Sequence, residues 1–270
     1  MPEPITTIGL GAIAAYLGKD GLQKLLGPTA DYLGGGLKDF TQKRIENVGN
    51  IFKRADEKLG SRRDEPGVIP PKILKTIMND ASFNDDALAV EYFGGVLASS
   101  RTQLGRDDRG ARMAKLVDSL STYQLRTHFL VYSTIRNIFK NLGYNFNIDD
   151  RKKMTILLPY QGFFESMEFG GEEALKIEAL LRHIFFGLVQ DGLIEDNFVY
   201  ADAPHLQKIY PKCTTAGIVC EPSALGAELF LWALGEGDKP LNFIFDATCS
   251  PSIDNLPDGM TSAISISNSI

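Results

Sequence analysis

Apolar residues recur at helical spacing along most of the chain, and this periodicity predicts a mainly α-helical protein. Shorter apolar runs bounded by Gly, Pro and Asn are typical of strands. The helical pattern covers residues 37–59, 73–81, 88–97, 113–120, 125–139, 171–190 and 225–234. The strand-like runs are residues 154–158, 198–200, 217–220 and 241–245. We therefore expect a helical N-terminal arm and a helical bundle, followed by a winged-helix-like α/β module.

Breaks in this pattern divide the sequence into four segments. Gly and Pro residues cluster between positions 60 and 71 and predict a linker. Residues 246–270 contain no Lys or Arg and show no periodicity, which predicts a flexible or loosely docked tail. The expected segments are a glycine-rich amphipathic helical arm at 1–65, a helical bundle at 66–142, a winged-helix-like module at 143–245 and a tail at 246–270.

The most structured signal lies at residues 69–102, which read as two helices joined by an acidic turn. Ser82 and Asp85 have the spacing of a capping box, and Asp85 and Asp86 would lie in a first helical turn, where the helix dipole favours anions. We interpret these acids and Glu91 as caps and solvated side chains rather than as a carboxylate site. Gly94 and Gly95 lie inside the second helix, where each costs about 1 kcal/mol relative to Ala. Close helix packing would offset that cost, so this pair is a candidate helix contact.

The N-terminal arm combines small and apolar residues in a way that leaves two interpretations open. It packs on its own body, or it forms a self-association or membrane face, because small residues allow close helix approach. The candidate face is Gly11, Ile13, Leu17, Gly18, Leu22, Leu25 and Leu26. The longest uncharged run, residues 4–18, is shorter than the roughly 20 residues that span a bilayer. We expect no simple transmembrane helix and no signal peptide.

Charge changes this picture in one place. The net charge of the 270-residue chain is -6, which gives no global attraction for nucleic acid. Residues 38–63 nevertheless contain eight basic and four acidic residues, a local net charge of +4. A solvated helix face explains this composition, and contact with anionic lipid headgroups or nucleic acid is the alternative. The three cysteines, an odd number without a CxxC motif, predict reduced, packed thiols in a cytoplasmic protein.

The order of elements in residues 171–245 is that of a winged helix: a helix, Gly-Leu-Ile, a hairpin and a last helix. In a DNA-binding module the helix at 171–190 would enter the groove. That helix carries Glu172, Glu173 and Glu178 against Lys176, Arg182 and His183. Carboxylates repel phosphates, so we favour a scaffold for protein contacts and do not expect a nucleic-acid partner.

Several of these motifs together resemble a known family. Ile-Pro-Pro-Lys-Ile-Leu at 69–74, Ser-x-x-Asp-Asp at 82–86 and Leu-Ala-Ser at 97–99 resemble the abortive-infection alpha family, a bacterial phage-resistance domain of otherwise unknown function. Residues 27–34, the basic helix with Asn47 and Ile51, Leu120-Ser121 and Leu193-Ile194 are also similar to that family. The resemblance spans residues 22–235. It departs at Gly94 and Gly95, where the family pattern leads us to expect larger side chains.

The resemblance implies a non-enzymatic anti-phage protein. We expect it to act through self-association, partner binding or membrane perturbation by the N-terminal arm, in the cytoplasm or at the inner-membrane surface. A homo-oligomer or a complex with a partner protein follows from that mechanism. The alternative function is a winged-helix DNA-binding regulator.

The sequence lacks the motifs that are typical of enzymes. The chain has no GxSxG, P-loop, HExxH or zinc-spaced Cys/His motif, and His128 is expected to be a packed or surface histidine. We predict no catalytic, cofactor-binding or metal site and no small-molecule substrate. An enzyme such as a nuclease would have to build its site from scattered residues.

Overall fold

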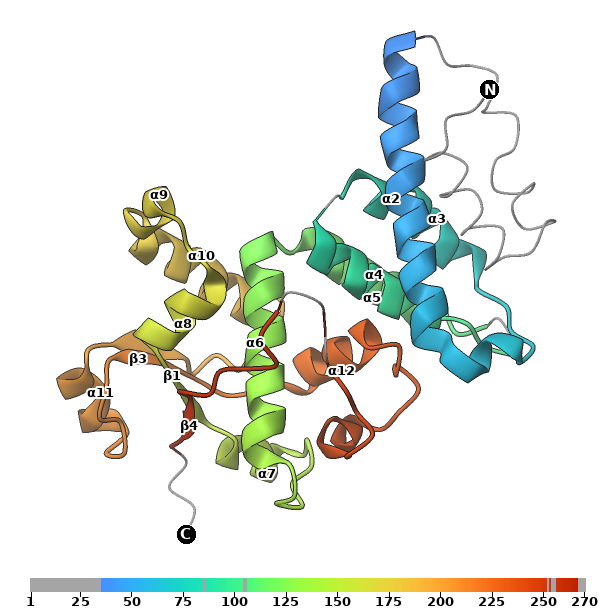
Figure 1. Cartoon of the computed structure of the whole chain (residues 1–270). Coiled ribbons are helices and arrows are strands. Elements are labelled where there is room, and N and C mark those ends of the chain that lie inside the picture. Colours follow the sequence, from blue (N-terminus) through green and yellow to red (C-terminus); the bar gives the residue numbers. More distant parts are fainter. Residues whose placement is uncertain (1–34, 85, 104–105, 252, 254–255, 267–270) are drawn as a thin grey trace. The chain divides into compact units, whose positions relative to one another are not determined.

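The computed structural model describes residues 35–84, 86–103, 106–251, 253 and 256–266 (Figure 1). The predicted fold class is confirmed: the protein is mainly helical, with a small antiparallel sheet. The candidate face of the N-terminal arm (Gly11, Ile13, Leu17, Gly18, Leu22, Leu25 and Leu26) lies outside the described residues. Among the helices that are described, none is both long and apolar enough to cross a membrane.

The chain divides into two compact units. The first ends at Ser119 and also includes Trp232–Asp238, and the second comprises Leu120–Leu231 and Lys239–Ile270. This division cuts across the four segments expected from the sequence. Residues 232–238 belong to the first unit although they lie far from it in the sequence. Local periodicity cannot predict such a long-range contact.

The first unit is built around one buried helix. Helix α4 is buried from Leu88 to Ser99, since α2 and α5 both pack against it. Helix α2 contributes an apolar stripe that includes the fully buried Ile51, Phe52 and Ala55. The elements of this unit are α2 (Gly35–Leu59), η2 (Gly60–Asp64), α3 (Pro71–Asn79), η3 (Ala81–Phe83), α4 (Ala87–Ser99) and α5 (Arg109–Ser119).

The acidic turn before α4 is capped differently from the prediction. Asp86 is the N-cap, and its Oδ1 accepts a hydrogen bond from the Ala89 amide at 2.9 Å. The predicted capping box at Ser82 is wrong. The Ser82 hydroxyl lies in η3, donates to the Asn79 carbonyl at 3.2 Å and accepts from Arg44 Nε at 3.0 Å. A serine that satisfies the end of the preceding helix is not available to begin the next one.

The second unit combines helices with the sheet. Its long helix α6 begins at a capping box in which Ser121 and Gln124 bind each other's backbone. The elements are α6 (Thr122–Phe139), α7 (Ile148–Lys153), β1 (Ile156–Pro159), α8 (Tyr160–Met167), α9 (Gly171–Ala174), α10 (Ile177–Gln190), β2 (Val199–Ala201), α11 (Ala203–Ile209), β3 (Gly217–Cys220), α12 (Ala224–Ala233, whose end belongs to the first unit), η4 (Leu241–Phe245) and β4 (Ile264–Ser265).

The strands of the described residues form one antiparallel sheet in the order β2-β3-β1-β4. Leu157 of β1 pairs with Val219 of β3 on one side and with Ile264 of β4 on the other. Helix α10 ends before Gly192, whose φ of 70° is the left-handed conformation that glycine tolerates at a helix end. A buried cluster lies beside the sheet and consists of Leu157, Leu206, Cys213, Val219 and Ile266.

In its described residues, the C-terminal segment is docked rather than flexible. Its described residues include strand β4 and the buried Met260 and Ile266. Thr134 Oγ1 on α6 accepts a hydrogen bond from the Met260 amide at 2.9 Å, and Asn137 donates to the Asp258 carbonyl. These contacts reach α6 from more than 120 residues away along the chain, so no local pattern reveals them. Residues 241–245, predicted as a strand, form the 3-10 helix η4 instead.

Candidate functional site

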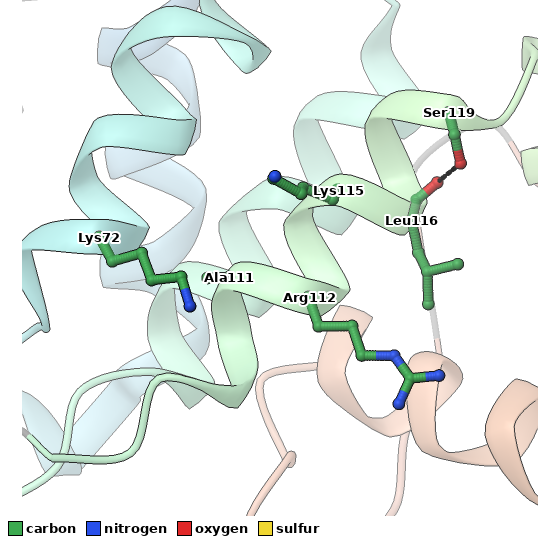
Figure 2. Close-up of a pocket in the computed structure, with 6 residues that line it drawn as sticks. All are labelled: Lys72, Ala111, Arg112, Lys115, Leu116 and Ser119. Atoms are coloured by element: carbon green, nitrogen blue, oxygen red, sulfur yellow. Dashed lines mark hydrogen bonds between the residues drawn. The ribbon is translucent and has the colours of Figure 1, made fainter.

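A pocket on the first unit gathers positive charge between two packed helices (Figure 2). Its volume is about 380 Å³. Helix α3 contributes one lysine and α5 contributes the remaining lining. The lining residues are Lys72, Ala111, Arg112, Lys115, Leu116 and Ser119.

The local sequence explains why these side chains line a surface pocket. Pro71 begins α3, because a proline at the first helical position gives up no intrahelical hydrogen bond, and Lys72 follows on the exposed side. Helix α5 buries Ala111, and its exposed face carries Arg112 and Lys115. In Figure 2, Lys72 and Lys115 come from facing helices, whereas Arg112 extends from α5 away from α3. The cations therefore surround an apolar floor rather than a single point.

The charges around the pocket are only partly compensated. Lys72 Nζ lies 2.8 Å from Asp108 Oδ2, but 65% and 56% of the two side chains are exposed. Ion pairs this exposed contribute between zero and about 1 kcal/mol. Arg109 is held by Asp107 at 2.7 Å, and this hydrogen bond keeps the pKa of Asp107 below its usual value. In the described part of the chain, no carboxylate lies within ion-pair distance of Arg112 or Lys115. The arrangement can therefore attract an anion.

Asp118, at the C-terminal end of α5, is a carboxylate that we expect to be destabilising. Partial burial, and then the nearby Asp80 carboxylate, raise the pKa of Asp118. A raised pKa means that the folded state binds the proton more tightly, so the ionised group opposes folding above that pKa. Asp118 also lies in the last turn of α5, where the helix dipole disfavours an anion.

Replacing Asp118 with Asn is therefore expected to raise the free energy of unfolding at pH 7 by about 0.5 kcal/mol, a small value because Asp118 is solvent-exposed. The gain should shrink as the pH falls through the pKa of Asp118, since the wild-type carboxyl then becomes neutral too. Urea unfolding at pH 7 and pH 3.5 measures both values. A variant that is less stable than wild type at pH 7 would show that Asp118 is held by a favourable contact.

A buried carboxylate joins α2 to α4, and it corrects the interpretation of Glu91 as a solvated acid. Glu91 is 7% exposed. Its Oε1 lies 2.7 Å from Arg54 Nε, and its Oε2 lies 2.8 Å from Lys58 Nζ. Two cations neutralise one buried acid, so this group connects the helices and is not free to act as a base.

The two glycines of α4 lie against different neighbours. A Cβ on Gly94 would lie 2.6 Å from the Arg54 Cβ on α2. A Cβ on Gly95 would lie 1.9 Å from the Ala233 carbonyl oxygen. Ser99, one helical turn later, accepts a hydrogen bond from the Gly237 amide at 3.0 Å. This face of α4 is therefore in direct backbone contact with the returning segment 232–238.

The core of the second unit contains a polar network centred on Tyr132. The Tyr132 hydroxyl donates to the Leu193 carbonyl at 2.7 Å and accepts from the Ser223 amide at 3.0 Å. The Ser223 hydroxyl in turn donates to the Gly192 carbonyl at 2.6 Å. Burial raises the pKa of Tyr132, so the hydroxyl stays neutral and can donate. The network connects α6 to the end of α10 and to the residues before α12.

Replacing Tyr132 with Phe is expected to lower the free energy of unfolding by about 2 kcal/mol, because the Ser223 amide and the Leu193 carbonyl lose a buried partner. Urea unfolding followed by circular dichroism measures this loss. Tyr144 to Phe is the matched control, since Tyr144 is only half-buried, and should change stability by less than about 0.5 kcal/mol. Equal effects of the two substitutions would argue against the network.

A serine–histidine pair lies at the start of α6. Ser121 Oγ is 2.9 Å from His183 Nε2, and the same hydroxyl accepts from the Gln124 amide. Nearby, the Tyr123 hydroxyl donates to Glu173 on α9, and this hydrogen bond lowers the pKa of Glu173. In the described structure no carboxylate orients His183. We interpret the pair as a helix cap that connects α6 to α10 rather than as a nucleophile and its base.

The three cysteines are buried thiols. Burial raises the pKa of the Cys220 thiol to about 12 and also raises that of Cys213. Because the thiolate is the reactive form, these pKa shifts favour packing over chemistry. Within the described ranges, no group of three or more His, Cys, Asp or Glu side chains could hold a metal ion.

Comparison with known proteins returns no match among family models, curated proteins or solved structures. The pocket is also a feature that sequence analysis did not single out. Arg112 and Lys115 are spaced three apart on one helix, a signal that is visible in the sequence. Lys72 lies 40 positions earlier, and only the packing of α3 on α5 adds it to the other two.

Proposed function

We propose that the chain is a non-enzymatic bacterial anti-phage protein of the abortive-infection type. It acts through self-association, partner binding or membrane perturbation by the segment before α2. The proposal takes its biological context from the sequence resemblance over residues 22–235. The observation that carries its mechanism is the way in which α2 is fixed to α4.

Helix α2 continues directly from the N-terminal segment, and its second half belongs to the body of the first unit. Ile51 and Phe52 are fully buried, and Asn47 donates to the Ser82 carbonyl at 3.0 Å. Glu91 on α4 binds Arg54 and Lys58 on successive turns of α2. A helix anchored by apolar contacts, a hydrogen bond and buried charges gives the preceding segment a fixed base. The acting part in this proposal is therefore the part of the arm that precedes this anchored half of α2, rather than the whole of 1–65.

The use of ionisable groups also supports a role in binding. The carboxylate of Glu91 is neutralised by two cations, and the imidazole of His128 is fully buried. The hydroxyl of Tyr132 is hydrogen-bonded to backbone groups. Groups committed to the fold in this way leave surface association as the simplest mode of action.

The experiment that tests the mechanism uses the full chain and a variant with Leu22, Leu25 and Leu26 each replaced by Asp. We expect the wild type to form oligomers by light scattering, or to release dye from vesicles of bacterial lipid, and the variant to do neither. A control with Thr6, Thr7 and Gln23 replaced by Asp adds the same charge at polar positions. A wild type that is monomeric and releases no dye, or a control that is as inactive as the variant, would contradict the mechanism.

The winged-helix regulator stays the alternative function. Helix α10 exposes Glu178 as well as Arg182, a mixed surface for a groove-binding helix. Fluorescence anisotropy with duplex DNA at several salt concentrations distinguishes the two functions. Affinity that falls steeply with salt would favour the regulator, because phosphate contacts release counterions.

A further inference from the structure

We propose that the pocket between α3 and α5 binds the phosphate group of a small organic phosphate ester. This inference does not depend on the anti-phage proposal, since it rests only on the lining of one surface pocket. It also departs from the expectation that the chain has no small-molecule ligand.

The charged residues that line the pocket are all positive. Lys72, Arg112 and Lys115 contribute three cations, and no acidic residue lines the pocket. Three other cations of the first unit are bound by carboxylates: Arg54 and Lys58 by Glu91, and Arg63 by Asp56 at 2.6 Å. Ammonium groups from two facing helices suit a phosphate, and the guanidinium of Arg112 adds a third cation at another side of the pocket.

Part of the pocket lining is apolar. Ala111 and Leu116 line the pocket together with the cations, so part of the surface that a ligand would meet is apolar. A volume of about 380 Å³ is at the lower end of pockets that hold small organic ligands. Inorganic phosphate alone would leave this floor uncovered. An ester with an apolar or planar organic part should therefore bind more tightly than phosphate.

Acidic residues beside the pocket favour a compact ligand over a polymer or a membrane. Asp107 and Asp108 lie directly before α5, at one side of the pocket, and the whole chain carries a net charge of -6. A nucleic acid or an anionic bilayer would extend beyond the pocket and meet these carboxylates. A compact ester meets only the one carboxylate that already contacts a lining cation, Asp108.

Asp108 gives the proposal a specific consequence. Its carboxylate now holds Lys72 at 2.8 Å, in an exposed pair that an incoming phosphate can displace. The ligand and Asp108 therefore compete for one ammonium group. Removing the carboxylate should strengthen binding, and removing a lining cation should weaken it.

Isothermal titration of the full chain with adenosine 5′-monophosphate, adenosine and inorganic phosphate tests this inference. We expect saturable binding of the monophosphate, weaker binding of inorganic phosphate and none of adenosine. Arg112 to Gln and Lys115 to Gln should each weaken the monophosphate complex about tenfold. Asp108 to Asn should strengthen it about threefold.

Lys75 to Gln is the matched control, because Lys75 is exposed on α3 but does not line the pocket, and it should leave affinity unchanged. The replaced cations are exposed, so unchanged thermal unfolding confirms that each variant folds. Equal weakening by Lys75 to Gln would overturn the proposal in favour of diffuse charge attraction. Binding only to phosphatidylglycerol vesicles or duplex DNA, or no saturation by millimolar monophosphate, would overturn it as well.

Discussion

Replacing Gly95 with alanine is expected to lower the free energy of unfolding by about 3 kcal/mol, as overpacking against backbone does at the upper end of its range. The added Cβ would lie 1.9 Å from the Ala233 carbonyl oxygen and 2.6 Å from that of Trp232. Both obstacles are main-chain atoms, so no side-chain rotation relieves the contact. The higher helix propensity of alanine returns only about 1 kcal/mol.

Gly171 to Ala is the control for Gly95. Gly171 begins α9, and a Cβ there would meet no atom within 4 Å. Urea unfolding should show this variant unchanged or slightly stabilised, because alanine restricts the unfolded chain. If Gly95 to Ala behaves like Gly171 to Ala, the contact between α4 and residues 232–238 is absent in solution.

Acidification from pH 7 to pH 4 is expected to remove about 3 kcal/mol of stability through a single side chain, His128. This imidazole is fully buried on α6, and Nε2 lies 3.0 Å from the Gly226 carbonyl. Burial lowers the pKa of His128 from 6.5 to about 4, although the hydrogen bond to Gly226 acts in the opposite direction. The unfolded chain therefore binds this proton more readily, and unfolding is favoured as the pH falls.

These two pKa values set the direction of the stability change and the pH range over which it occurs. The stability that neutral His128 contributes is complete above pH 6.5, declines as the pH falls and is lost by about pH 4. At about 1.4 kcal/mol per pH unit, the gap between the pKa values gives the estimate of about 3 kcal/mol. Comparing urea unfolding of wild type and His128 to Gln across this range isolates the contribution from other titrating groups.

An independent measurement covers the case in which His128 to Gln fails to fold. Nuclear magnetic resonance of the wild-type imidazole should show a neutral ring at pH 5.5, where an ordinary solvent-exposed histidine is protonated. A His128 ring that titrates near pH 6.5 in the folded protein would contradict its burial.

Much of the helical framework could be predicted from the sequence. The periodicity located α6 and α12 to within three residues, since each buries one face against a core. The helix predicted at 171–190 occurs as two helices, α9 and α10. Gly192 follows this helical pattern closely, and its φ of 70° is typical of a glycine at a helix end. Strand β3 was predicted at residues 217–220, the range in which it occurs.

Features that depend on distant partners could not be predicted. Strand β4 is two residues long and is stabilised by pairing with β1, so it has no alternation of its own. Ser82 matched the spacing of a cap, but its hydroxyl is used by Asn79 and Arg44. Glu91 looked like a surface acid because its cations lie on another helix. The cationic pocket was missed for the same reason, since Lys72 joins it only through the packing of α3 on α5.

The most direct test of the proposed function is the efficiency of plating of a phage panel on bacteria that express the chain. The account predicts fewer plaques with the wild type, protection lost when Leu22, Leu25 and Leu26 are replaced by Asp, and protection kept when Thr6, Thr7 and Gln23 are replaced by Asp. Equal expression of the three proteins, checked by immunoblot, makes the comparison valid. Unchanged plating on wild-type cells for every phage, or full protection by the leucine variant, would contradict the account.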